Sequence, residues 1–296
     1  MTVRIRTLVE LVRAPAALSV PGDVAAGSAA RRPSSQTTML MLSSCLLYWA
    51  GMALNDYADR EVDAAERPAR PIPSGRVPPG LALGLAISFT GLATTIAALS
   101  CGRRTLRVTV PLAGTVWGYN MGLKRIPAGP ATMAAARALD VLHGAGPGGF
   151  RDAAPAAAAI GAHTYGVSTV GRAEVSGASR RVPGAALTMT TTIVSTLLPR
   201  AIRMTAVRGP ESRHRLVGAT MSAALAVYVG TTGTAQLKAL RDPSPARLRQ
   251  ATSAGILGMI PLQAALTAGG GAPRRAATVL TLFPIARRLF GRVSPT

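Results

Sequence analysis

The sequence has few acidic, cysteine and aromatic residues. Only 12 of its 296 residues are Asp or Glu, two are cysteine and 4% are aromatic. Cys45 and Cys101 each lie in or at the end of an apolar stretch, so neither a disulfide framework nor a cysteine metal site is indicated. With 48% hydrophobic and 15% charged residues and a mean hydropathy of +0.30, the chain is too apolar for an ordinary soluble domain. The composition also excludes a disordered or fibrous chain.

Basic residues are numerous, but their number says little about function. Of the 33 Lys and Arg residues that give a net charge of +21, 31 are Arg. Together with abundant Ala and Gly, this bias is typical of GC-rich coding. The charge alone therefore gives no reason to expect a nucleic-acid partner, and we expect none.

Charged residues form short clusters between long uncharged runs. Uncharged stretches of 26, 24, 22, 19 and 18 residues are residues 77–102, 250–273, 216–237, 37–55 and 182–199. A helix that crosses the hydrocarbon core needs roughly 20 mainly apolar residues. Further candidate segments are residues 8–30, 108–123, 130–146 and 153–171. The pattern predicts an all-α polytopic membrane bundle of about nine transmembrane helices, with residues 1–296 in a single domain.

The ends of the chain leave two questions open. Residues 1–13 lack the pattern of a cleavable signal, so we interpret residues 8–30 as a first, broken membrane helix. Residues 276–292 could form a further membrane segment. Lys and Arg are divided about equally between the two expected sides, so their count does not orient the bundle.

A cluster of carboxylates follows the uncharged run 37–55. Five of the 12 acidic residues lie between residues 56 and 66. If the helix continues, a turn of about 100° per residue places Asn55, Asp59 and Asp63 on one face, with Asp56 near its edge. Such oxygen ligands suit Mg²⁺, which uses one or two carboxylates together with water and substrate phosphates. The cluster predicts a magnesium diphosphate site, and the alternative is a solvated acidic helix end.

Three arginines follow the acidic cluster and favour the first interpretation. Arg67, Arg70 and Arg76 lie in a segment stiffened by four Pro or Gly residues. A guanidinium offers a planar pair of donors to phosphate oxygens. Expected metal ligands and anion-binding groups are thus adjacent in the sequence.

The acidic run and its loop resemble the first aspartate motif of the UbiA superfamily of intramembrane prenyltransferases. The matching residues are Asn55, Asp59 and Asp63, spaced four apart, followed by Arg70-Pro71-Ile72-Pro73-Ser74-Gly75. Tyr119 with Lys124 and Arg125 is similar to a Tyr and Lys-Arg pattern of the family, one residue longer here. The resemblance implies a helix bundle around a central, laterally open cavity. It also implies that Mg²⁺ holds a prenyl diphosphate whose allylic carbon an acceptor attacks.

The resemblance is weaker where the family has its second aspartate motif. Residues 163–177 contain one acid, Glu174, with Arg172 two positions before it. This predicts a single-metal mechanism or an altered substrate. Together with residues 127–144, the segment is similar to the EboC-like bacterial members, which implies an integral protein of the bacterial cell membrane.

The residues and the resemblance together assign a role to each candidate. We expect Asp59, Asp63 and Glu174 to be catalytic, and the metal to bind at Asn55, Asp56, Asp59 and Asp63. Substrate-binding residues are Arg67, Arg70, Tyr119, Lys124, Arg125, Tyr165 and Arg172. The expected partners are a prenyl diphosphate, an aromatic or other lipophilic acceptor and membrane lipid, with no obligate protein partner.

Two polar groups in apolar segments have two interpretations each. Arg137 and Asp140 are three residues apart, so they can pair across one helix face, which we favour over direct substrate contact. For His163 we favour a core hydrogen bond over a role as proton acceptor.

Two functions other than a magnesium-dependent prenyltransferase stay open. A cation-coupled transporter would spread its acids through the helices, whereas here they cluster at one helix end. A non-catalytic isoprenoid-binding protein is suggested by the single acid in the second motif region.

Overall fold

The chain folds into an all-helical bundle in the part that the structure, a computed structural model, describes. This part comprises residues 5–13, 17, 19–31, 34–206 and 212–290. The first half contains α1 (Ile5–Leu11), α2 (Val20–Gly27), α3 (Ser35–Ala58), α4 (Arg60–Glu66), α5 (Pro79–Cys101), α6 (Leu106–Met121) and α7 (Gly129–Ala145). The second half contains α8 (Phe150–Arg172), α9 (Arg181–Ala206), α10 (Ser212–Tyr228), α11 (Thr234–Arg241), α12 (Pro245–Gly269) and α13 (Pro273–Phe290). The predicted all-α class is confirmed.

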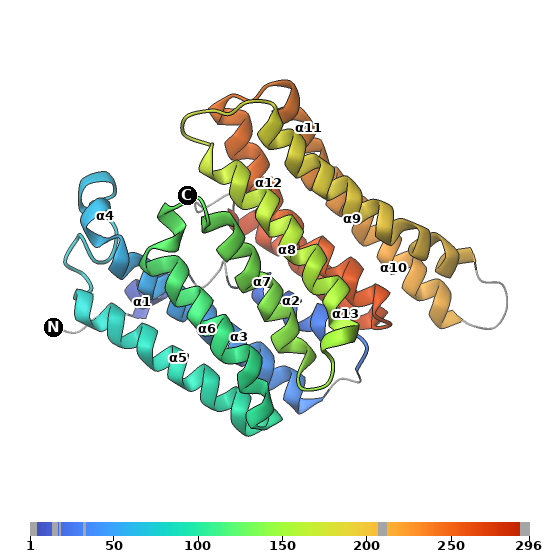
Figure 1. Cartoon of the computed structure of the whole chain (residues 1–296), viewed down its shortest axis with the longest axis horizontal. Helices are drawn as coiled ribbons and strands as arrows, with labels where there is room; N and C mark the ends of the chain where they lie inside the picture. The colour runs from blue at the N-terminus through green and yellow to red at the C-terminus, as the bar shows by residue number, and fades with distance from the viewer. Residues whose placement is uncertain (1–4, 14–16, 18, 32–33, 207–211, 291–296) are drawn as a thin grey trace.

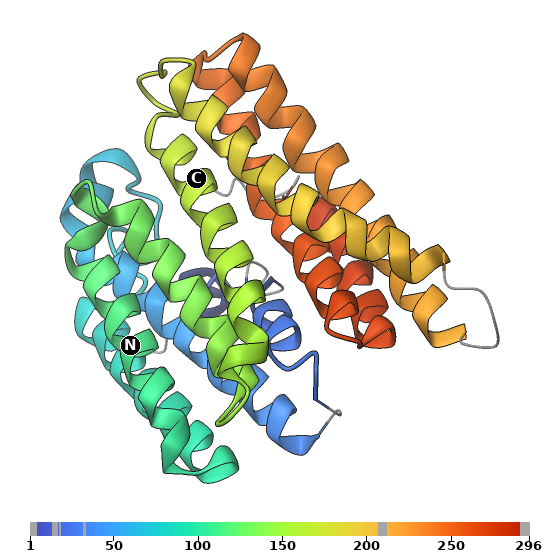
Figure 2. The ribbon, with the colours of Figure 1, turned by 45° about the vertical axis from the view of Figure 1, so that its right-hand side comes forward.

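The helices lie side by side in two groups (Figures 1 and 2). α3, α5 and α6 form one group and α9 to α13 the other, with α2, α7 and α8 between them. Five segments of the described chain are long and apolar enough to cross a membrane: α3, α5, α9, residues 213–241 and α12. These helices make the chain an integral membrane protein. The count of about nine crossings stays a prediction.

Two segments singled out in the sequence have a definite place in the bundle. The uncharged run 216–237 continues from α10 through one π-helical turn, Val229–Gly233, into α11. Most of residues 276–292 belong to α13, which packs against α10 and α12. α13 is not among the five membrane-spanning candidates, and residues 291 and 292 lie outside the described residues.

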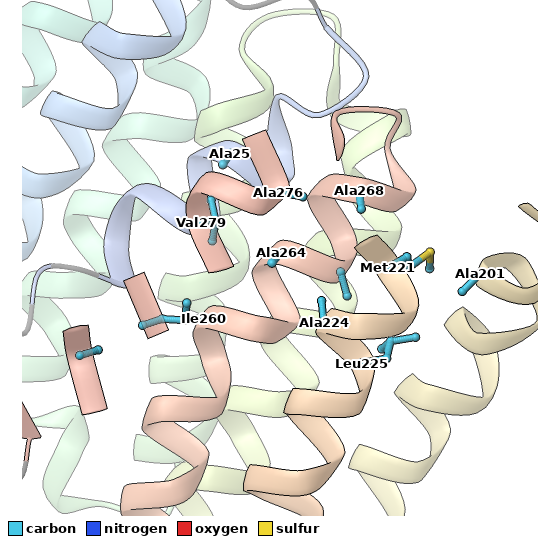
Figure 3. Close-up of a cluster of buried hydrophobic side chains, with 12 residues drawn as sticks. Ala25, Ala201, Met221, Ala224, Leu225, Ile260, Ala264, Ala268, Ala276 and Val279 are labelled. Atoms are coloured by element: carbon cyan, nitrogen blue, oxygen red, sulfur yellow. The ribbon is translucent and has the colours of Figure 1, made fainter. Parts of the chain in front are cut away.

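Small side chains allow the helices of the second group to pack closely. Figure 3 shows Ala264 and Ala268 of α12 in one apolar cluster with Met221 and Ala224 of α10. Of the most apolar window of α12, 78% is buried inside the bundle. Gly and Ala let helix backbones approach one another, which is how bilayer helices gain packing energy. α12 therefore lies at the centre of this second group of helices.

α2 is enclosed by its neighbours although it has only eight residues. It packs against α3, α7, α8 and α12, and Asp23 on it is fully buried. The contact with α7 requires glycine, because a Cβ on Gly144 would lie 2.4 Å from the Cα of Val24. A Cβ on Gly27 would lie 1.9 Å from the Val141 carbonyl oxygen. These close approaches bring Asp23 to the interior of the bundle.

Gly144→Ala is expected to destabilise the protein by about 1–3 kcal/mol, because the added methyl group would overlap the α2 backbone. Gly91→Ala is a matched control, since a Cβ there meets no atom within 4 Å. Gly91 is exposed within α5, where alanine is the better helix former, so this variant should be at least as stable as the wild type. The measurement is the thermal unfolding midpoint in detergent. Equal midpoints for the two variants would contradict the tight contact between α2 and α7.

Candidate active site

The predicted row of oxygen ligands lies where α3 gives way to α4. The backbone N–H of Asp59 donates to the Asn55 carbonyl at 2.9 Å, and that of Asp63 donates to the Asp59 carbonyl at 2.8 Å. The helical hydrogen-bond pattern thus continues through Asp59, although this residue, at φ −95° and ψ 3°, separates the two helices. Asn55, Asp59 and Asp63 consequently follow one another at intervals of one turn, as the spacing predicts.

Lys124 binds the first two oxygen ligands of this row. It lies on the short turn Leu123–Arg125, between α6 and α7. Its Nζ donates to Asn55 Oδ1 at 2.9 Å and to Asp59 Oδ2 at 2.6 Å. Arg125 donates to the other oxygen of Asp59 at 3.1 Å. Burial would raise the pKa of Asp59, but the hydrogen bonds and charges of Lys124 and Arg125 outweigh this effect and lower it.

Arg70 neutralises two carboxylates that are almost completely buried. Its Nη1 lies 2.6 Å from Asp63 Oδ2 and 3.5 Å from Asp56 Oδ1. The side chains of Asp56 and Asp63 are only 5% and 4% exposed, so their charges need a partner. The loop that carries Arg70 folds back on itself through a hydrogen bond from Val77 N to the Pro71 carbonyl. The loop arginine expected to bind phosphate thus lies at the acidic cluster.

Arg13, which the sequence does not mark as a site residue, also contacts this cluster. It follows α1 and donates from Nη2 to Asp56 Oδ1 at 3.1 Å. Its φ of 46° lies in the left-handed region, which is uncommon for a residue other than glycine. No motif marks Arg13 in the sequence, because its contact joins positions 43 residues apart.

The other two loop arginines lie farther out. Arg76 forms a two-bond ion pair with Glu10 of α1, at 2.6 and 2.9 Å. Arg67 is exposed. Among the loop arginines of the described chain, only Arg70 has an ion pair with the acidic cluster.

The region of the missing second motif contributes little to the arrangement. Glu174 follows α8, and its carbonyl accepts a hydrogen bond from Arg249 at 3.2 Å. Its Oε2 atom is buried and has no hydrogen-bond partner among the described residues. Arg172 donates to the Ile126 carbonyl, just beyond the turn that carries Lys124. The proposed roles of Glu174 and Arg172 stay predictions.

A cavity of about 290 Å³ begins beside Asn55 and runs along α3. Most of its wall is apolar, with Leu47, Met52, Leu112 and Val116 among the lining residues. Tyr119 lines it as well, whereas Tyr165 is 40% exposed on α8 and does not. An apolar cavity that adjoins an acidic and basic cluster suits a ligand with a charged head and a hydrocarbon chain.

The contacts of Arg137 contradict the pairing predicted from the sequence, whereas those of His163 agree with its predicted role. Arg137 does not pair with Asp140 as predicted, since its Nε lies 3.0 Å from Asp23 Oδ2. Asp23 comes from α2, a helix whose position the sequence did not predict. The ring of His163 is hydrogen-bonded to Tyr228 Oη at 2.9 Å and the Gly255 carbonyl at 3.0 Å, as a structural core histidine would be.

The side chains of the acidic row suit a metal ion that binds together with a phosphate ligand. They suit a metal ion coordinated by protein side chains alone less well. In the described chain, no group of three or more His, Cys, Asp or Glu side chains could hold a metal ion. Asn55 and Asp59 offer hard oxygen donors, but Lys124 and Arg125 already bind them. Mg²⁺ typically takes one or two carboxylates and completes its coordination with water and substrate phosphates. The donor set therefore fits Mg²⁺ as part of a metal–diphosphate complex.

Comparison with known proteins identifies the family. Residues 15–172 match the model of the UbiA prenyltransferase family. A digeranylgeranylglyceryl phosphate synthase of Methanothrix thermoacetophila is 45% identical over 84 residues, which are 26% of this chain and 30% of the relative. One from Methanopyrus kandleri is 36% identical over 131 residues, 41% of this chain and 45% of the relative. The matches thus span less than half the length of either relative. Both organisms are archaea, so a bacterial membrane is not supported.

Solved structures share the fold over most of the chain. A structure of digeranylgeranylglyceryl phosphate synthase in membranes aligns with a TM-score of 0.62 at 16% identity, covering 90% of this chain and 98% of that one. A UbiA homologue from Archaeoglobus fulgidus bound to DMAPP and Mg²⁺ aligns with a TM-score of 0.57 at 15% identity, covering 93% and 99%. The family match covers more than half of the sequence, and the helix bundle and the acidic row after α3 are consistent with it. The chain therefore belongs to the UbiA prenyltransferase family.

Proposed function

We propose that the protein transfers a prenyl group from a prenyl diphosphate to an acceptor within the membrane, with Mg²⁺ as cofactor. One observation carries this proposal. The acidic row of α3 and α4 meets basic side chains from three other segments beside an apolar cavity. A prenyl diphosphate has the matching pair of properties, an anionic head and an apolar chain. The A. fulgidus homologue bound to DMAPP and Mg²⁺ supports the choice of substrate and metal.

The diphosphate would bind between the acidic row and its basic partners. We assign Asn55, Asp59 and Asp63 to the metal, with Asp56 behind them, and Lys124, Arg70 and Arg125 to the phosphates. Lys124 uses two of its three N–H donors on Asn55 and Asp59, so the third is available to a phosphate oxygen. Bound Mg²⁺ would neutralise negative charge as it develops on the leaving diphosphate.

Prenyl transfer itself breaks one bond and forms another. The bond between the allylic carbon and the diphosphate oxygen breaks, and its electron pair leaves with the diphosphate. The acceptor attacks the allylic carbon and loses a proton. Lys124, Arg125 and Arg70 stabilise the charge that develops on the diphosphate, because they are already positioned by Asp59 and Asp63. Apolar side chains such as Leu47 and Val116 exclude water from the reactive carbon.

The remaining residues have secondary roles in this proposal. Tyr119 would contact the substrate from the cavity wall, and Arg67, Arg172 and Tyr165 would act at its edge. Glu174 would orient the acceptor or a bridging water. The relatives' name includes glyceryl phosphate, so a glyceryl lipid is a candidate acceptor beside an aromatic one.

A non-catalytic isoprenoid-binding protein is the second candidate, and one observation favours it. Glu174 provides the only acid of the second motif region, and its Oε2 has no hydrogen-bond partner in the described chain. Product formation separates the two candidates. Purified protein is incubated with radiolabelled dimethylallyl, geranyl and geranylgeranyl diphosphates and a lipid extract, with and without Mg²⁺. Labelled lipid that forms only with Mg²⁺ supports the transferase, and binding without product supports the alternative.

Asp59→Asn is expected to reduce Mg²⁺-dependent turnover about 100-fold or more, because it removes a charged ligand while keeping the size of the side chain. Asp242→Asn is the control, since Asp242 is 60% exposed in the loop before α12. Both variants are assayed at saturating prenyl diphosphate after their thermal stability has been checked. Turnover of Asp59→Asn within threefold of the wild type would show that Asp59 is not part of the site.

Arg70→Ala should weaken prenyl diphosphate binding about tenfold or more, whereas Arg76→Ala should change it less than threefold. The reason is that Arg70 contacts Asp56 and Asp63, while Arg76 is engaged with Glu10 outside the acidic cluster. Equilibrium binding of labelled diphosphate with Mg²⁺ provides the dissociation constants. Arg70→Lys is measured alongside, because it keeps a charge beside the buried carboxylates and so separates binding from folding. Similar losses for Arg70→Ala and Arg76→Ala would contradict the assignment.

A further inference from the structure

A groove of about 490 Å³ lies between α10 and α13, on the outer surface of the bundle. Its lining residues are mostly small or apolar and include Ala219, Ala223, Ala277, Thr281 and Pro284. These five residues are exposed, so no other part of the described chain covers them. The Thr281 hydroxyl donates to the Thr278 carbonyl at 2.7 Å and needs no partner in the groove. Because α10 belongs to a membrane-spanning segment, the groove opens toward lipid.

Each of the two helices carries an arginine on the same face as its groove residues. Arg215 precedes Ala219 on α10 by four residues, and Arg274 precedes Ala277 on α13 by three. Residues three or four apart lie above one another on one face of a helix. The two guanidinium groups are therefore carried one turn before the apolar part of the groove.

The two arginines lie at the same end of the groove, because α10 and α13 begin side by side. Arg213 in the first turn of α10 donates from Nη2 to the Gly271 carbonyl at 3.1 Å, two residues before α13. Arg215 and Arg274 are exposed. Their guanidinium groups form no hydrogen bond or ion pair with another described residue. All of their N–H donors are thus available to a ligand.

This end of the groove has a strong excess of positive charge. Residues 200–215 contain five Arg and one Glu, and residues 273–290 contain four Arg and no acid. Arg binds phosphate oxygens through pairs of N–H donors. Basic segments at a membrane surface attract anionic lipids for the same reason. A phosphate at the basic end with a hydrocarbon chain along the groove would match both features.

A second copy of the chain is the other occupant that a groove of small residues could take. Its charge disfavours this occupant. Two copies inserted in the membrane with the same orientation would bring their basic ends to the same depth, where like charges repel. An anionic lipid instead supplies the opposite charge at this place.

We propose that the groove between α10 and α13 binds one anionic phospholipid. Its phosphate lies between Arg215 and Arg274, and one hydrocarbon chain follows the groove past Ala219 and Ala277. The groove extends from Ala277 to Pro284 on α13, which is about 10 Å along the helix. The lipid contacts both helices and holds α13 against α10.

This lipid site lies on the opposite side of the membrane from the acidic row. Arg249 in the first turn of α12 donates to the Glu174 carbonyl, and Arg172 at the end of α8 donates to the Ile126 carbonyl beside the turn that carries Lys124. α12 thus begins on the side of the acidic row. Its 25 residues span about 37 Å and end beside the start of α13. The lipid site therefore does not depend on the proposed prenyl transfer.

Native mass spectrometry of the delipidated protein in detergent tests the site directly. Dioleoylphosphatidylglycerol and dioleoylphosphatidylcholine, which have the same chains, are titrated separately, and the affinity for the first bound lipid is measured. The anionic lipid is expected to bind about tenfold more tightly, since two guanidinium groups favour its charge. Glycerol 3-phosphate has the phosphate but no chain, and it should not compete at equal concentration.

Paired variants assign this preference to the basic end of the groove. Arg215→Gln combined with Arg274→Gln removes two exposed charges and should reduce the preference to about twofold or less. Arg287→Gln combined with Arg288→Gln is the matched control, because it removes two exposed charges from the other end of α13. The control should keep the preference of the wild type.

A third variant tests the apolar part of the groove. Ala219→Leu combined with Ala277→Leu fills the groove from both helices and should weaken binding of the anionic lipid about tenfold or more. Both positions are exposed, so the larger side chains do not enter the core. Thermal unfolding shows whether each variant is folded, and the arginine variants test the site even if the leucine variant is not.

Four results would overturn this inference. They are equal affinities for the two lipids, a preference that survives in the Arg215 and Arg274 variant, an equal loss in the Arg287 and Arg288 control, and efficient competition by glycerol 3-phosphate. A dimer that the leucine substitutions abolish would show that a second copy occupies the groove instead. Binding of prenyl diphosphate is measured separately and tests only the proposed function.

Discussion

Carboxylates can be held together at the edge of a membrane only if positive charge reaches each of them. In this chain that charge comes from segments distant in sequence. Arg13 and Arg70 reach Asp56 and Asp63, and Lys124 reaches Asp59 from the turn between α6 and α7. These pairs fix the end of α1, the loop after α4 and the turn before α7 around the end of α3. We propose that the same basic groups bind a diphosphate.

Close helix packing controls the rest of the cavity. α2 can lie at the centre of the bundle because Gly144 of α7 admits its backbone. Asp23 is thereby brought opposite Arg137, and Gln263 of α12 completes the contact. The cavity consequently has charged groups at both ends and apolar walls between them.

The sequence predicts the local parts of this arrangement better than the distant ones. The ligand row at Asn55, Asp59 and Asp63 follows from helical spacing alone, and the long uncharged runs predict the main helices. The pairing of Arg137 was predicted wrongly, because i,i+3 spacing favours Asp140, whereas the tertiary packing of α2 supplies Asp23 instead. Arg13 was missed for a similar reason, since nothing near it in sequence signals a contact with Asp56. The wall of the cavity depends on side chains from several helices and has no sequence signature.

We propose that the acidic row binds metal together with a diphosphate rather than alone. Lys124, Arg125 and Arg70 already neutralise its carboxylates, so a free cation must compete with them. Electron paramagnetic resonance of Mn²⁺, used in place of Mg²⁺, measures metal affinity with and without a prenyl thiolodiphosphate. We expect weak binding to the protein alone and binding at least tenfold tighter when the diphosphate is present. Equally tight binding without the diphosphate would contradict the account.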